Sequence, residues 1–202
     1  MLLQNLSHKL WKCSLINVSN LVKIRYLDYH NYSKKIEEVV NIQIQAEQQA
    51  AQDYLHLAVS FLHPSKSFLG AGGFFLNMYK EELDHMQKLI QYQLLRGGYP
   101  NICGLKSPYK NKNVNLLNAF KQSLYMEIEI TKLLEQGIEI AEGVKDYHYA
   151  EFITSAFLSE QIKSIHEISN HVTRLTSLGN NQHAQYHYDW KLAKMYPYSN
   201  KI

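Results

Sequence analysis

Apolar residues recur every three or four positions along most of the chain, which is the spacing of an amphipathic helix. The pattern predicts four long helices: at about 36–62, a second that ends at residue 96, at about 114–141 and at about 147–178. No proline lies inside them. Gly70, Gly72 and Gly73 fall at the start of the second helix and predict a frayed or shifted first turn there. No strand-like alternation is present, so the expected fold is all-α.

The lengths of the connections predict how these helices are arranged. Short turns join the first helix to the second and the third to the fourth, which makes each pair antiparallel. Residues 97–113 could span about 56–61 Å when extended, whereas a helix of about 28 residues is about 42 Å long. This connection can therefore cross the whole bundle and leave the second and third helices parallel. The prediction is a four-helix bundle with one long crossover.

Each predicted helix has one apolar face with a polar residue near its middle. These polar residues are Glu47 in the first helix, Glu82 and His85 in the second, Glu127 in the third and Gln161 in the fourth. The face of the fourth helix is expected to contain Ala150, Thr154, Phe157, Gln161, Ser164, Ile168, Val172 and Leu175. Since the polar residues stand about halfway along their helices, they should meet in one layer inside the bundle.

Three buried carboxylates are costly unless a positive charge compensates them. The middle of the four faces has no lysine or arginine, so a metal ion is the expected counter-charge. Glu82 and His85 are three residues apart on a helix and can share one ion. Carboxylate oxygens with one imidazole suit iron, manganese or zinc, and three carboxylates exceed the usual protein ligands of one catalytic zinc. Two metal ions bridged by a carboxylate fit best. Taken singly, Glu47 also suits a surface position, Tyr54 suits the core, and a Glu-x-x-His pair is common on helices.

The chain resembles ferritins of the catalytically active, heavy-chain type over about residues 31–178. The segments that carry the resemblance are NIQIQAEQQAAQDYLHL, YKEELDHMQKLIQYQLLRGG, LLNAFKQSLYMEIEITKLL and FLSEQIKSIHEISNHVTRL. The fourth helix offers Gln161 and Ser164 and not a second Glu-x-x-His pair, which differs from the bacterioferritin type of di-iron bundle. The resemblance implies a ferritin-like bundle at 31–180, an N-terminal extension at 1–30, and a C-terminal tail or short fifth helix at 181–202.

The resemblance also implies roles for individual residues. Glu82 would bridge two irons, Glu47 and His85 would hold the first, and Glu127 would hold the second. Gln161 would orient water or an oxygen species nearby, and Tyr54 would hydrogen-bond to the site. Residues implied in iron transfer or entry are Glu81, Asp84 and Glu151. Thr154 departs from the family, which has a second acidic ring at that position, and the tail after residue 179 is more polar than the family's fifth helix.

The function implied by the resemblance is iron storage and detoxification with ferroxidase activity. Two Fe(II) ions per subunit would be oxidised to Fe(III) by dioxygen, and ferric mineral would be deposited inside an oligomeric shell. That shell would be a homo-oligomer, or a hetero-oligomer with other ferritin subunits, of 24 subunits. The alternatives are a slow-oxidising structural subunit and a different di-iron oxidase that acts on an organic substrate.

Charge and hydropathy exclude two classes of partner and point to a compartment. The chain has a net charge of +3, and residues 1–30, with four basic residues and one acidic, account for all of it. The rest has no basic stripe, so no nucleic-acid partner is expected. No apolar stretch approaches the length of a membrane helix. The extension is basic, poor in acids and amphipathic, as mitochondrial presequences are, so the expected location is mitochondrial, with cytoplasmic as the alternative.

Overall fold

The computed structural model describes residues 32–107 and 114–199. The predicted N-terminal extension at 1–30, and with it the predicted compartment, lies outside the described residues. The described residues form helices and contain no strand. The helices are α2 (Lys34–Leu62), α3 (Leu69–Leu95), α4 (Leu116–Gly143), α5 (Tyr147–Ile153), the π-helical turn η1 (Thr154–Leu158), α6 (Ser159–Leu178) and α7 (Gln182–Met195).

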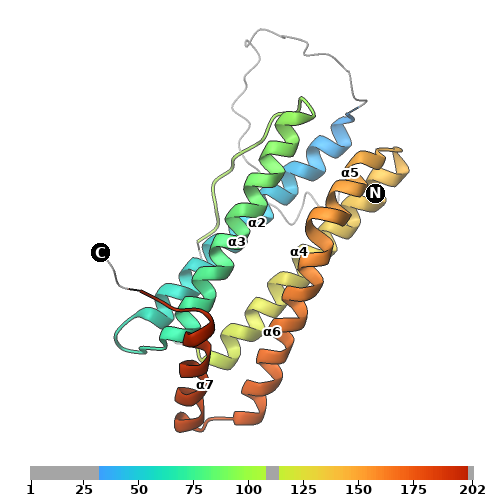
Figure 1. Ribbon diagram of the computed structural model, residues 1–202. Helices are drawn as coiled ribbons and strands as arrows, with labels where there is room; N and C mark the ends of the chain where they lie inside the picture. The colour runs from blue at the N-terminus through green and yellow to red at the C-terminus, as the bar shows by residue number, and fades with distance from the viewer. Residues whose placement is uncertain (1–31, 108–113, 200–202) are drawn as a thin grey trace.

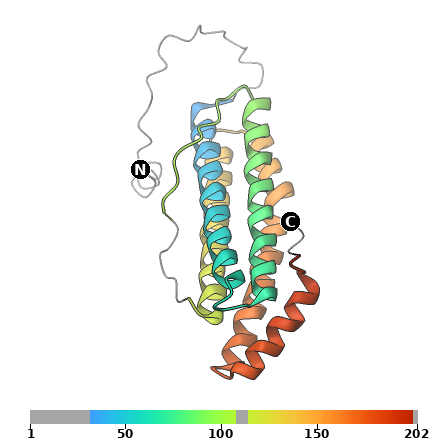
Figure 2. The ribbon, with the colours of Figure 1, turned by 90° about the vertical axis from the view of Figure 1, so that its left-hand side faces the viewer.

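The helices form two antiparallel pairs that lie along one another (Figure 1). The first pair is α2 and α3, and the second is α4 with the α5–η1–α6 helix. After α3 the chain turns back along the bundle before α4 begins, so α3 and α4 run in the same direction (Figure 2). This arrangement confirms the predicted all-α bundle with one long crossover. No described helix combines the length and the apolar character that crossing a bilayer requires.

The core consists of two apolar clusters, one toward each end of the bundle. One cluster is built around aromatic residues, with Phe61, Phe74, Phe75 and Phe120 all buried. The other consists mainly of aliphatic residues of α2, α3 and α4 together with aromatic residues of α5 and η1. Glu82 and His85 of α3, Glu127 of α4 and Gln161 of α6 each fall between residues of the two clusters, and Glu47 of α2 lies near the boundary between them. The predicted polar layer therefore divides the hydrophobic core.

The start of α3 differs from the prediction. The helix begins at Leu69 and contains all three glycines, which are buried, so the expectation of a frayed or shifted first turn is wrong. A Cβ atom on Gly70 would lie 2.1 Å from the backbone oxygen of Asp189, and one on Gly73 would lie 2.1 Å from that of Tyr196. Gly70 and Gly73 therefore give α7 and the residue after it room to pack directly against the α3 backbone.

Asp189 of α7 also completes the beginning of α3. Phe68, the residue before α3, offers no side-chain cap. The Asp189 carboxylate instead accepts hydrogen bonds from the backbone N–H groups of Gly70 (3.2 Å) and Ala71 (2.7 Å). Two other long helices have local caps, since Ser33 caps α2 and Asn115 caps α4. The first turn of α3 is thus held by a residue near the end of the chain.

The fourth predicted helix is also different, because the π-helical turn η1 interrupts it. A π turn has more residues per turn than an α-helix, so it shifts the helix face that points at the core. Before η1, Tyr149 and Ile153 are buried, while Thr154, the first residue of η1, is exposed. The prediction that Thr154 lies on the core face is therefore wrong. After η1, Phe157 and Gln161 are buried as predicted.

Candidate metal centre

Five polar side chains occupy the layer between the two apolar clusters, and each is at most 3% exposed. They come from all four parts of the bundle: Glu47 from α2, Glu82 and His85 from α3, Glu127 from α4 and Gln161 from α6. Glu82 and His85 face the same side because they stand one turn apart on α3. All five residues that the sequence placed at the middle of the helix faces are buried in this layer.

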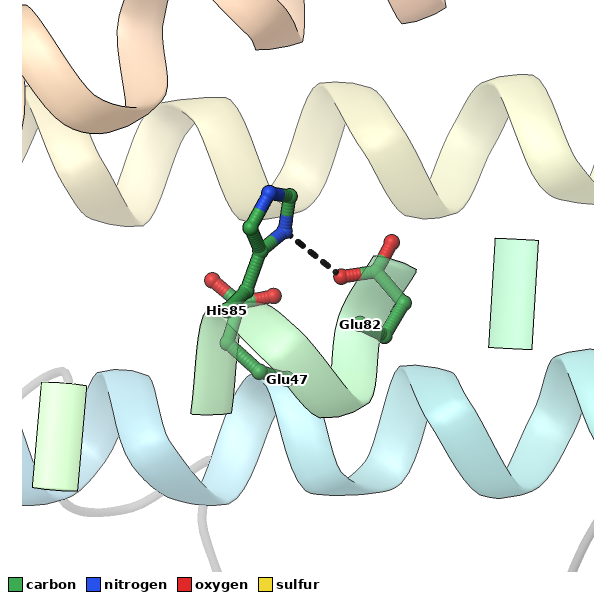
Figure 3. Close-up of side chains that lie close together, drawn as sticks. All are labelled: Glu47, Glu82 and His85. Carbon is green, nitrogen blue, oxygen red and sulfur yellow. Dashed lines mark hydrogen bonds and ion pairs between the residues drawn. The ribbon is translucent and has the colours of Figure 1, made fainter. Parts of the chain in front are cut away.

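Glu47, Glu82 and His85 lie closest together. One ligand atom from each lies within 4.8 Å of the other two. His85 Nδ1 is 3.2 Å from Glu82 Oε2, and Figure 3 shows the Glu47 carboxylate reaching toward this pair from the neighbouring helix. Gln43, which the sequence analysis did not identify, donates a hydrogen bond of 2.5 Å to Glu47 Oε1. Glu47 Oε2 is buried and has no hydrogen-bond partner, so it is an available ligand atom.

Glu127 interacts with Glu82, and hydrogen bonds hold both of its carboxylate oxygens. The Tyr54 hydroxyl donates to Oε1, and the Gln161 amide donates to Oε2. Gln161 Nε2 also donates to the backbone oxygen of Glu127 at 3.2 Å. Since one Glu127 oxygen faces Tyr54 and the other faces Gln161, the orientation of this carboxylate is fixed.

Burial dominates the electrostatics of the three carboxylates. It raises the pKa of Glu47 and Glu82 well above the ordinary value, and it raises the pKa of Glu127 despite the opposing hydrogen bonds from Tyr54 and Gln161. The charge of Glu127 raises the pKa of Glu82 further, and the charge of Glu82 does the same to Glu47. Glu82 therefore lies within reach of both neighbouring carboxylates.

Whether these carboxylates suit a bound cation depends on whether a basic side chain already compensates their charge. In the described residues, their only ion-pair partner is His85, which contacts Glu82. A buried anionic group without a lysine or arginine must take up protons or bind a cation. Two or three carboxylates and one imidazole form a ligand set for a hard or borderline divalent ion. One of these carboxylates, Glu47, has an oxygen that accepts no hydrogen bond. The residues present thus fit iron.

A second acidic group links this layer to the surface. His85 Nε2 is 3.2 Å from Glu160 Oε2 of α6, and a further potential ligand group consists of Glu81, His85 and Glu160. The Ser164 hydroxyl donates to Glu81 Oε1 at 3.3 Å. The Glu160 side chain is 45% exposed. Sequence reasoning missed Glu160 because it lies beside the core face and not on it, although it directly precedes Gln161.

The remaining predicted transfer and entry residues lie apart from this layer. Asp84 is exposed and forms an ion pair of 2.7 Å with Lys88 one turn later on α3. Glu151 and Thr154 are exposed where α5 passes into η1. In the described residues, neither Asp84 nor Glu151 belongs to a group of side chains that could hold a metal ion.

Comparisons with known proteins agree with the helical-bundle fold. A family model for the ferritin-like domain matches residues 37–178. Ferritin-1 heavy chain of Schistosoma mansoni is 31% identical over 150 residues, which cover 74% of this chain and 87% of that protein. The matched residues of the family model include the whole polar layer and end before α7.

Proposed function

We propose that this chain, which belongs to the ferritin family, oxidises Fe(II) at the buried carboxylate layer in addition to storing iron. The observation that carries the proposal is the convergence of three buried carboxylates and one imidazole with no lysine or arginine paired to them in the described residues. A storage subunit without this chemistry has no need for such a group, because a buried anionic cluster destabilises the fold when no cation compensates it.

Two Fe(II) ions are the substrate in this proposal, and the ligands divide between them. Glu82 lies within reach of both other carboxylates and is assigned as the bridge. Glu47 and His85 are assigned to the first iron, and Glu127 to the second. Anionic oxygen ligands stabilise Fe(III) relative to Fe(II), so this ligand set favours the loss of one electron from each iron to dioxygen.

The surrounding residues prepare the carboxylates for this chemistry. Because burial raises the pKa values of Glu47 and Glu82, binding of Fe(II) is coupled to the release of protons from this layer. Burial also raises the pKa of Tyr54, which stays protonated and keeps its hydrogen bond to Glu127. Gln161 holds the second oxygen of Glu127. These two residues position Glu127 without adding charge.

The half-exposed Glu160 and its neighbour Glu81 suggest a route between the site and the surface. Both can contribute ligand atoms together with His85, so an iron ion could pass between the two groups through the shared imidazole. We therefore keep Glu81 as a transfer residue, whereas Asp84 is paired with Lys88 at the surface. Whether Glu151 takes part in iron entry depends on how the subunits assemble. We propose a shell of the 24-subunit ferritin type.

The test is the rate of Fe(II) oxidation after anaerobic loading and exposure to oxygen. Glu82→Ala should abolish fast oxidation because the bridging ligand is lost, while the helical content and the assembly stay as in the parent. Glu139→Ala is the matched control, since it removes an exposed glutamate of α4. If Glu82→Ala oxidises Fe(II) as fast as the parent, the oxidation site lies elsewhere. A slow parent that still takes up iron would identify a structural storage subunit.

A further inference from the structure

Helix α7 carries two histidines on an exposed face, at the end of the bundle where α3 begins (Figure 1). His183 and His187 are four residues apart, and both are exposed. Side chains at this spacing are neighbours on one side of a helix, one turn apart. In the described part of the chain, neither imidazole takes part in a hydrogen bond or an ion pair. Both rings are therefore available to a ligand.

The backbone that presents the two histidines is firmly held. The Asn181 side chain caps α7 by accepting a hydrogen bond of 3.0 Å from Ala184 N, and Gln185 Nε2 donates to Gly179 O at 2.8 Å. Farther along the helix, Asp189 ties α7 to the start of α3. The first two turns of α7 are thus fixed from both sides, so the separation of the two rings is set by the helix.

The ring of His187 is also oriented by a neighbour. It stacks on the indole of Trp190, with ring centroids 5.8 Å apart and planes inclined by 25°. The Lys194 ammonium lies 3.5 Å from the centroid of the same indole. The stack restricts the rotation of His187 and leaves the edge of its ring free. It also places a fluorescent side chain directly beside a potential ligand.

Two imidazoles on adjacent turns are a recognised way for a helix to hold a divalent transition metal. Imidazole nitrogen favours borderline ions, and the ordinary order of affinity places Cu²⁺ above Ni²⁺ and Zn²⁺. This preference differs from that of the buried carboxylate layer, whose oxygen ligands suit iron. We propose that His183 and His187 form a surface site for a borderline divalent metal, with Cu²⁺ bound most tightly and water completing the coordination.

The test uses Trp190 emission as the readout for Cu²⁺ added to the whole protein. Trp11→Phe provides the background, because Trp11 is the only other tryptophan of the chain. Cu²⁺ should quench the emission in a saturable way with one ion per chain. His183→Gln should raise the half-saturating Cu²⁺ concentration at least about tenfold, since even changes beside a metal ligand cost about 10–100-fold in affinity. This variant leaves the stack of His187 on Trp190 intact.

His166→Gln is the matched control, because it removes an exposed histidine of α6 and should leave the titration unchanged. Equal quenching curves for the parent and His183→Gln would overturn the proposal. The site is independent of the proposed iron chemistry, so the two fail separately. Glu82→Ala should keep the Cu²⁺ response of Trp190, and His183→Gln should keep the parent's rate of Fe(II) oxidation.

Discussion

His171 of α6 is a buried histidine outside the carboxylate layer, and it joins α6 to α7. Its Nδ1 atom is 2.5 Å from the Tyr188 hydroxyl, and its Nε2 atom is 3.6 Å from Glu167 Oε1. The rings of Phe74 and Phe120 pack beside the imidazole. A neutral ring with its proton on Nε2 accepts the hydroxyl proton of Tyr188 and faces Glu167 with a donor, so it satisfies both partners.

This environment gives His171 a predictable effect on stability. Burial lowers its pKa, and Glu167 opposes the shift. The folded protein therefore binds fewer protons at this site than the unfolded chain does. The stability that His171 contributes is complete above the unfolded pKa of about 6.5 and is lost as the pH falls through that value toward the lower folded pKa. Acidification should weaken the attachment of α7.

The measurement is the melting temperature of the parent and of His171→Gln at about pH 7.5 and about pH 5. The variant should be less stable than the parent at the higher pH, and its melting temperature should fall less on acidification. His166→Gln, at an exposed histidine of the same helix, should follow the parent. A variant with the same pH dependence as the parent would contradict the assignment of this effect to His171.

The sequence predicted the burial of the polar layer because helical periodicity alone assigns Glu47, Glu82 and Glu127 to core faces. It did not predict Gln43 or Glu160, which contact the layer from beside those faces. The contact of Tyr188 with His171 could not be predicted from the sequence either. It depends on the angle at which α7 leaves α6 after Gly179, and no periodicity within either helix specifies that angle.

At the scale of elements, two local features separate the structure from the predicted pattern. The π-helical turn η1 moves the buried positions of the fourth helix to Tyr149 and Ile153. A pattern read at a constant 3.6 residues per turn cannot anticipate such a change of phase. The glycines of α3 led to the wrong prediction of a frayed first turn for a different reason. Helix propensity describes an isolated helix, whereas the first turn of α3 packs against α7.

For a Gly→Ala substitution in the first turn of α3, helix propensity and packing predict opposite effects on stability. Propensity alone says that Gly→Ala stabilises a helix by about 0.5–1 kcal/mol. Gly70→Ala should instead destabilise the protein by about 1–3 kcal/mol, since its Cβ would meet the backbone of α7. Gly143→Ala, at the end of α4 where a Cβ has open space, should be neutral or stabilising. Urea unfolding measures both, and a stable Gly70→Ala would show that α7 packs elsewhere.

At the scale of the whole molecule, apolar side chains are exposed where α3 ends. Leu94, Leu95, Tyr99 and Ile102 lie in or just after the last turn of α3, and Leu95 is 71% exposed. A soluble chain rarely leaves such a group in water, and members of the ferritin family form oligomeric shells. We infer that this group lies in a contact between subunits.

Light scattering at micromolar concentration tests this inference. The parent should form a large assembly, and Leu95→Lys should shift it to smaller species while the helical content stays the same. Gln91→Lys, which adds the same charge one turn earlier on the exposed side of α3, is the matched control. An unchanged assembly in Leu95→Lys would place the contact on another surface, and a monomeric parent would remove the basis for a shell.

The carboxylate of Asp189 that completes the first turn of α3 has a consequence for the order of events during synthesis. It stands 119 residues after Gly70 and 118 after Ala71 in the chain. The ribosome therefore releases the whole of α3 long before the group that seals its beginning. Contacts of such long sequence separation form late in folding, because the chain between them must first be ordered. We therefore expect α7 to close late in folding, after α3 has formed, and a nascent chain that stops short of α7 should leave the first turn of α3 without its cap.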